Sequence, residues 1–169
     1  MERLTHWAKE RYQQGLLTKQ DLQKPDFLII AEQREPVAAH EEGHAIVARG
    51  LRWGVNFETV IPNGNTLGLT EVSPAAGKSQ PELILDSIAI SIGGQAGEEL
   101  TGITDHSGCG SDIFKQNFLA DLYIRLTGSI RSVGAIISEQ TSRARSYIGS
   151  FGEFNHRQRS LSLVRACSF

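Results

Sequence analysis

Two histidines four residues apart, with a glutamate directly after the first, are the residues of this sequence best suited to chemistry. They are His40, Glu41 and His44, in the segment His-Glu-Glu-Gly-His. On a helix, residues four apart lie one above the other, so both imidazoles can reach a single Zn²⁺ ion. Glu41 would stand beside the metal without binding it, where it can take a proton from water and pass it to a leaving amine. The segment therefore predicts metal-assisted hydrolysis.

A catalytic zinc site needs a third protein ligand and an open position for water. No further histidine follows at the spacing of the metzincin motif, because residues 45–54 contain none. Chemistry favours a glutamate on a following helix, and geometry equally favours an aspartate at a helix start behind a glycine-rich loop. A lone cysteine is more often a small buried apolar residue than a ligand. The downstream candidates are Glu98, Glu99, Asp105, His106, Cys109 and Asp112.

The two histidines must be positioned by a helix, and the sequence predicts one over residues 36–51. Apolar residues and both histidines recur there at three- and four-residue spacing, which places the histidines on the inward-facing stripe. Gly50 and Gly54 end this helix. Pro36 either kinks a longer helix or opens a new one at its first turn.

A short β-rich region follows, and then more helices. Residues 57–61 and 66–70 flank an Asn-Gly turn and predict a β-hairpin. A helix over 81–100 carries three glycines and an alanine in its interior, which is costly unless another backbone, that of the 36–51 helix, approaches closely. A glycine-rich loop spans 102–111, and Ser111 would cap a helix over 112–127. A last helix is expected over 132–148.

The composition is that of an ordinary globular protein. The chain has 169 residues, 40% hydrophobic and 21% charged, with a net charge of −2. These values exclude a disordered or fibrous chain. They also exclude a protein that binds nucleic acid mainly through a large positive net charge. No apolar run approaches the ~18 residues of a membrane span, and the polar N-terminus has no signal peptide. We therefore expect a cytoplasmic protein without a disulfide framework, since only Cys109 and Cys167 are present.

These elements predict a mainly α fold with one small β-hairpin, organised in three parts. An N-terminal helical segment covers 1–35, a zinc-binding core covers 36–130, and a C-terminal helix with a basic tail covers 131–169. The last part carries 6 basic and 2 acidic residues. Its charge indicates either a solvated tail or a docking surface for an acidic partner.

Four sequence blocks, in order over about residues 37–130, resemble the FtsH family, the ATP-dependent zinc proteases of bacteria and organelles. VAAHEEGHAIVA resembles the zinc-binding helix of that family. ETVIPNGNTLGLT is similar to its strand segment I-I-P-R-G…A-L-G-Y-T. IGGQAGEEL is similar to its G-G-R-x-A-E-E helix, and SGCGSDIFKQNFLADLYI to its T-G-A-x-N-D-[LI] segment.

The resemblance implies a zincin-like helical zinc metalloendopeptidase, in which Asp112 is the third zinc ligand beside His40 and His44. Glu41 would be the general base and then the general acid. Glu98 would support the site, for example by orienting a histidine ligand. The segment Leu67-Gly68-Leu69-Thr70 would be the strand edge that pairs with an extended polypeptide substrate.

Several features depart from the family pattern. Glu42 stands where the family usually has alanine, Asn63 replaces an arginine, and Leu69 replaces a tyrosine. No G-x-x-x-x-G-K-[ST] phosphate-binding loop occurs in the chain. We therefore expect either a peptidase that works alone on unfolded chains and peptides or one that receives them from a separate ATPase partner. The ring assemblies of the family add self-association into a homo-oligomer as a further expectation.

Two alternative functions stay open at the level of sequence. The first is a degenerate relative that binds zinc or a peptide as an adaptor without hydrolysing it. The second is a zinc hydrolase acting on another kind of amide, because the histidine motif specifies metal-assisted hydrolysis better than it specifies the substrate. No nucleic-acid partner is expected.

Overall fold

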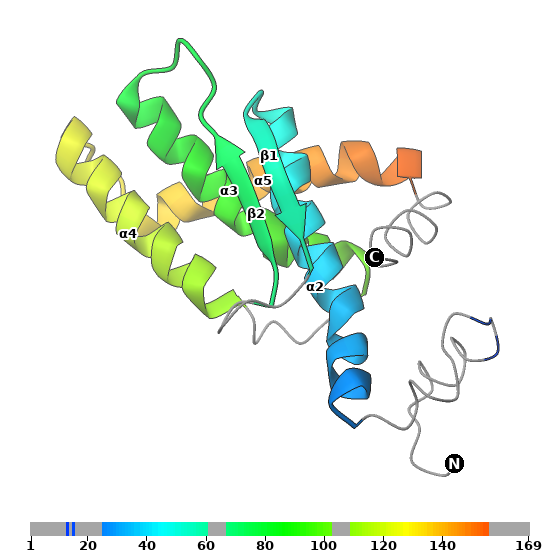
Figure 1. Ribbon diagram of the computed structural model, residues 1–169. Coiled ribbons are helices and arrows are strands. Elements are labelled where there is room, and N and C mark those ends of the chain that lie inside the picture. Colours follow the sequence, from blue (N-terminus) through cyan, green and yellow to red (C-terminus); the bar gives the residue numbers. More distant parts are fainter. Residues whose placement is uncertain (1–12, 14, 16–24, 61–66, 103–108, 156–169) are drawn as a thin grey trace. The chain divides into compact units, whose positions relative to one another are not determined.

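Long helices and one two-stranded sheet make up the described part of the chain, which covers residues 13, 15, 25–60, 67–102 and 109–155 of a computed structural model (Figure 1). The prediction of a mainly helical fold with a small β-hairpin is confirmed. In chain order the elements are α2 (Pro25–Gly50), β1 (Gly54–Thr59), β2 (Leu69–Ser73), α3 (Gln80–Leu100), α4 (Gly110–Thr127) and α5 (Val133–Asn155).

Helix α2 carries both histidines and passes through Pro36 without being split into two helices. It ends at Gly50, as the sequence predicted. The chain forms two compact units, Met1–Val37 and Ala38–Phe169. The elements that position the candidate site belong to the second unit. Most of the predicted N-terminal helical segment lies outside the described residues, and the proposed three-part division stays a prediction.

Helices α2 and α3 approach each other at glycines. A Cβ on Gly93 would lie 2.6 Å from the carbonyl oxygen of Gly43, closer than real Cβ atoms come. One on Gly43 would meet the carbonyl of Gly93, and one on Gly97 would meet the carbonyl of Ala39. The predicted close approach of the two helices is therefore confirmed, and it explains why α3 tolerates glycines that would otherwise weaken it.

Along the sequence, the two strands of the β-hairpin lie closer to the neighbouring helices than predicted. Its strands pair antiparallel, with Glu58 opposite Thr70 and Thr59 opposite Leu69, and with an irregularity between Val55 and Phe57. The predicted boundaries, 57–61 and 66–70, were wrong by about three residues on each strand. β1 begins at Gly54, soon after α2 ends, and its side chains are exposed or half-buried. It therefore lacks the clear alternation that marks a strand in sequence. The predicted turn lies outside the described residues.

Helix α4 begins two residues earlier than predicted. Its first residue is Gly110, and Cys109 precedes it without capping it through its side chain. The prediction that Ser111 caps the helix was wrong, because Ser111 already lies within the first turn. This start places Asp112 in that turn. Gly128 ends the helix in the left-handed conformation, with φ 68°, and its N–H donates to the carbonyl of Ile124.

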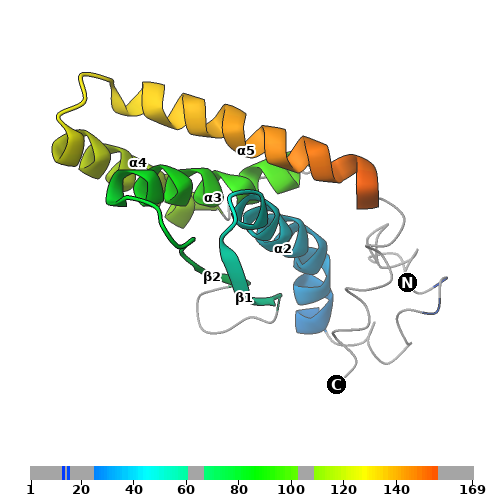
Figure 2. The ribbon, with the colours of Figure 1, turned by 90° about the horizontal axis from the view of Figure 1, so that it is seen from above.

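Helix α3 is the central packing element. It packs against α4 and α5, and these two helices also pack against each other. In Figure 2, α5 runs along one side of α2, α3 and α4, and the β-hairpin lies on the other side. The apolar core joins these helices and the residues after α2, and includes Ile46, Val47, Leu51, Trp53, Ile84, Ile88, Ile92, Ala120, Ile136, Ala144 and Ile148.

A buried carboxylate fixes α3 to its neighbours. Asp86, 1% exposed, accepts a hydrogen bond of 2.9 Å from Trp53 Nε1. It also pairs with Arg143 of α5 at 2.9 Å and with Lys78 from the loop before α3. Buried charges need such partners because burial without them is costly.

Among the helices that the structure describes, none combines the length and the apolar character of a membrane span.

Candidate metal centre

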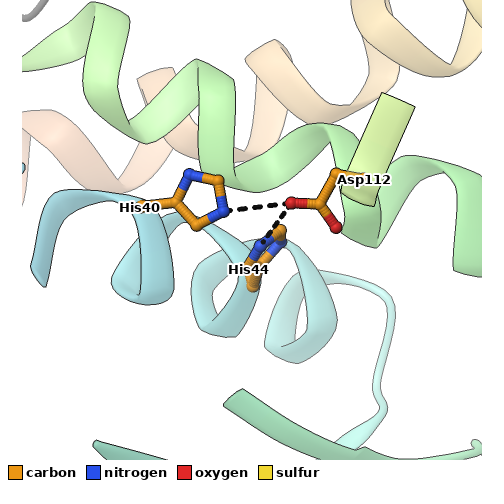
Figure 3. A group of neighbouring side chains, drawn as sticks. All are labelled: His40, His44 and Asp112. Atoms are coloured by element: carbon orange, nitrogen blue, oxygen red, sulfur yellow. Dashed lines mark hydrogen bonds and ion pairs between the residues drawn. The ribbon is translucent and has the colours of Figure 1, made fainter. Parts of the chain in front are cut away.

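Side chains from two helices converge on one point between α2 and α4. His40 Nε2 lies 3.0 Å from Asp112 Oδ2, and His44 Nε2 lies 3.3 Å from the same oxygen (Figure 3). The two histidines come from successive turns of α2, and Asp112 comes from the first turn of α4. All three side chains are 12–17% exposed. The structure thus brings together the three residues that the sequence analysis put forward as zinc ligands.

Groups on helix α3 orient both imidazole rings through their Nδ1 atoms. His40 Nδ1 lies 2.8 Å from Glu98 Oε1, and His44 Nδ1 lies 2.7 Å from the carbonyl oxygen of Ile90. Each ring therefore uses Nδ1 for a partner on α3 and directs Nε2 toward Asp112. Metal-binding histidines commonly donate their second ring N–H in this way, which fixes the tautomer and the ring direction.

The His40 ring occupies space that a glycine leaves open. A Cβ on Gly94 would lie 2.5 Å from Cε1 and 2.6 Å from Nε2 of His40. Any side chain at this position of α3 would therefore displace the ring. Gly94 belongs to the G-G pair noted in the sequence.

The donor set fits a cation. The carbonyl of Ile90 can only accept, so Nδ1 of His44 carries the ring proton. In a neutral ring this leaves a lone pair on Nε2 facing the carboxylate of Asp112 at 3.3 Å. Such a set of acceptors is stable around a positive charge, and two imidazoles with one carboxylate form a common three-ligand set for catalytic zinc.

The pKa shifts at the site come from the close contact between its carboxylates and imidazoles. Burial alone raises the pKa of Asp112, but the adjacent imidazoles of His40 and His44 outweigh burial and hold the pKa well below its usual range. Burial lowers the pKa of His40, yet its hydrogen bonds to Asp112 and Glu98 raise the pKa above the ordinary value. Asp112 is therefore an anion at neutral pH, as a metal ligand must be.

Glu41 directly follows His40 on α2 and is 7% exposed. The hydroxyl of Thr70, on β2, lies 2.6 Å from Glu41 Oε2 and 3.1 Å from the Glu41 carbonyl oxygen. The general base proposed from the sequence is thus buried and hydrogen-bonded to the hairpin. Sequence reasoning missed this contact, because Thr70 was noted only as part of the strand edge.

The other candidate ligands take different places. Glu98 supports His40, as described above. Glu99 instead forms a bidentate ion pair with Arg145 of α5, with distances of 3.0 and 3.1 Å, and so ties α3 to α5. Asp105 and His106 lie outside the described residues.

Cys109 lies near the Nδ1 side of the His40 ring, whereas Asp112 lies near its Nε2. Its Sγ is 3.8 Å from His40 Nδ1 and 3.6 Å from Glu98 Oε2, and the residue is 1% exposed. Burial, and then the charge of Glu98, raise the pKa of the thiol to about 12. At neutral pH Cys109 is therefore a thiol that donates to Glu98. Cys109, Glu98 and His40 also form a second group of side chains with metal-binding spacing.

An acidic pair lies on the side of α2 that faces β1. Glu42, the departure from the family pattern, and Glu58 of β1 both lie 3.9 Å from Arg49. Burial raises the pKa of Glu58, the negative charge of Glu42 raises it further, and Arg49 partly opposes them, so the pKa reaches about 7. Glu42 thus interacts with the sheet.

Comparison with known proteins gives consistent matches. The model of peptidase family M41 matches residues 27–162. An ATP-dependent zinc metalloprotease FtsH from Mesomycoplasma conjunctivae is 37% identical over 123 residues, which cover 69% of this chain and 16% of the relative. The protein of the same name from Cutibacterium acnes is 35% identical over 119 residues, covering 68% and 16%.

A third relative extends the match slightly. The ATP-dependent zinc metalloprotease FtsH from Cupriavidus metallidurans is 31% identical over 130 residues, which cover 75% of this chain and 19% of the relative. The chain therefore spans less than a fifth of the length of these curated relatives.

Proposed function

This chain belongs to peptidase family M41 as an FtsH-family peptidase domain, and from that membership we propose that it is a zinc metalloendopeptidase acting on extended polypeptides. The family resemblance noted in the sequence is confirmed. The observation that carries the proposal is the convergence of His40 Nε2, His44 Nε2 and Asp112 Oδ2 at 3.0–3.3 Å.

His40, His44 and Asp112 would hold the zinc ion. The support comes from their donor types, from the Nδ1 partners on α3, and from the anionic state of Asp112. When bound, Zn²⁺ supplies Lewis-acid chemistry, which polarises a carbonyl group and makes water a nucleophile at neutral pH.

Glu41 is the proposed general base and then the general acid. It directly follows His40 on α2 and does not belong to the group of three converging side chains. In this role it removes a proton from the attacking water and then delivers a proton to the leaving amine. Its burial keeps bulk water from competing for the carboxylate.

The proposed substrate site is the free edge of β2. In the described residues the sheet consists of β1 and β2, so β2 has one edge without a strand partner. Leu67 and Leu69, 44% and 50% exposed, lie along this part of the chain. An extended peptide added as a further strand would be read mainly through its backbone, which suits a broad range of sequences.

The partners and the location are also proposals. The relatives are named ATP-dependent, and a separate ATPase would supply unfolded chains to this domain. Self-association into a homo-oligomer and a cytoplasmic location complete the proposal, and nucleic acid has no part in it.

Cleavage of an unfolded protein tests the proposal directly. The zinc-loaded chain is incubated with casein, with and without a chelator. We expect cleavage that the chelator abolishes and added zinc restores. Glu41→Gln should keep its zinc and lose at least ~10²-fold in rate, the size of a general-base contribution. Glu42→Gln, the adjacent glutamate facing the sheet, is the matched control and should stay active.

Three results would contradict parts of this proposal. Intact casein after long incubation with zinc-bound wild type would favour the non-hydrolytic adaptor. Cleavage of small amides without cleavage of polypeptides would favour a different zinc hydrolase. Full activity of Glu41→Gln would remove Glu41 from the mechanism.

A further inference from the structure

The carboxylate of Glu41 is held by a residue from a different element, 29 positions later in the chain. The hydroxyl of Thr70 lies 2.6 Å from Glu41 Oε2 and 3.1 Å from the Glu41 carbonyl oxygen. Both acceptors belong to one residue, so a single hydroxyl contacts the side chain and the backbone of Glu41. Rotation of the carboxylate would break the shorter of these contacts.

We propose that Thr70 is a positioning residue, whose hydroxyl holds the Glu41 carboxylate in the orientation needed to exchange protons with water. This inference rests on the proposed peptidase function. Thr70 acts through Glu41 and needs no contact with the reacting atoms. Its contribution comes from orientation, and small misplacements of a catalytic group are costly in rate.

The strand directs the hydroxyl toward α2. Thr70 is half-buried in β2, whereas its neighbours Leu69 and Glu71 are exposed, as expected for side chains that alternate between the two faces of a strand. Thr70 stands opposite Glu58 of β1, which fixes its place in the hairpin. Threonine is branched at Cβ and therefore has few side-chain rotamers, so the strand backbone determines where the hydroxyl points.

The same contact connects the general base to the proposed substrate strand. β2 carries Thr70, and the free edge of β2 is where an extended peptide would add. A peptide paired with this strand would therefore be aligned with respect to Glu41 through one residue. The hydroxyl should matter for turnover more than for peptide binding, because peptide pairing uses backbone groups.

Three variants of the full chain test this role. Thr70→Val keeps the branched shape and removes the hydroxyl, Thr70→Ser keeps the hydroxyl, and Thr141→Val removes a hydroxyl that donates to the carbonyl of Ile137 within α5. With an unfolded fluorogenic peptide, Thr70→Val should lower kcat about 10- to 100-fold, the size expected when a catalytic group is slightly misplaced. KM and zinc content should stay close to wild type. Thr70→Ser should restore most of kcat, and Thr141→Val should leave it unchanged.

A second measurement is independent of activity. Urea unfolding of Thr70→Val is compared in the wild-type background and in a Glu41→Ala background, as a double-mutant cycle. If the hydroxyl holds the carboxylate, Thr70→Val lowers the midpoint more in the wild-type background. Equal shifts in both backgrounds would overturn the inference.

The outcomes separate this inference from the proposed function. An active wild type in which Thr70→Val keeps the wild-type kcat overturns the role of Thr70 and leaves the peptidase function standing. A wild type that binds zinc but cleaves no polypeptide overturns the peptidase function. In that case the unfolding cycle alone decides whether Thr70 holds Glu41.

Discussion

His40 Nδ1 lies 2.8 Å from Oε1 of Glu98, a carboxylate that is 4% exposed and comes from the neighbouring helix α3. The ring N–H donates to this anionic acceptor, which fixes the tautomer and makes Nε2 a better electron donor. The thiol of Cys109 donates to the other oxygen of Glu98 at 3.6 Å. Contacts thus connect Cys109, directly before α4, through Glu98 of α3 to the His40 ring on α2.

Glu98→Gln should weaken zinc binding. The amide can still accept from His40, but it lacks the negative charge, and the loss of such a partner costs about 10- to 100-fold in metal affinity. Zinc affinity is measured by competition with a chromophoric chelator. Glu99→Gln is the matched control, since the adjacent Glu99 pairs with Arg145, and it should keep the wild-type affinity. Equal affinities of the two variants would remove Glu98 from the site.

Asp112→Asn should lose zinc more severely than Glu98→Gln. The substitution keeps the shape of the side chain and removes the charge that faces both Nε2 atoms. We expect an affinity loss greater than about 100-fold, beyond the range for supporting residues. Metal content by mass spectrometry measures it, with Asp121→Asn on the exposed face of α4 as the control. A variant that retains one zinc per chain would reopen the choice of the third ligand.

Gly94→Ala should separate metal binding from folding. The new Cβ would meet the movable His40 ring at 2.5 Å, so the ring shifts and zinc affinity falls by at least about 10-fold. Gly43→Ala places its Cβ against the backbone of Gly93 and should instead unfold the domain at a much lower temperature. Gly149→Ala, in open space on α5, should gain up to about 1 kcal/mol. Thermal unfolding and zinc affinity, measured for all three variants, test these three expectations.

Glu58 should make stability fall with rising pH. Its pKa is about 7 in the folded protein, and an unfolded glutamate titrates near 4.3. Between about pH 4.3 and pH 7 the folded state binds more protons, so the free energy of unfolding decreases as the pH rises through this window. Glu58→Gln removes this dependence.

Urea unfolding at pH 5 and pH 8, with chelator present, measures the effect of Glu58. The Glu58→Gln variant should gain stability relative to wild type at pH 8 compared with pH 5. Glu71→Gln, an exposed glutamate on the partner strand, should show no such difference. A constant offset between Glu58→Gln and wild type at both pH values would contradict the prediction.

The helical spacing of His40 and His44 was enough to predict that their rings share one face, because this depends only on local geometry. Asp112 could be preferred over the other candidates only through family resemblance, since no local rule relates it to histidines 68 and 72 positions earlier. The structure brings the three side chains together, and their role as zinc ligands stays a prediction.

Two contacts that orient the residues of the candidate site could not be predicted from the sequence. The carbonyl of Ile90, which orients His44, is a backbone group that any residue would offer. The Thr70 hydroxyl reaches Glu41 only through tertiary packing of the hairpin on α2. The residue type of Ser111 favours a cap position, but the chain enters α4 earlier, at Gly110.

The glycine contacts between α2 and α3 also restrict how the domain can move. Sliding one helix along the other would bring a Cβ from a neighbouring residue onto a carbonyl that now faces a glycine. His40, His44, Glu98 and Ile90 all belong to this helix pair, so they should shift together as one rigid body. Asp112 alone arrives from α4. Any motion that opens or closes the candidate metal centre must therefore displace the first turn of α4 relative to the α2–α3 helix pair.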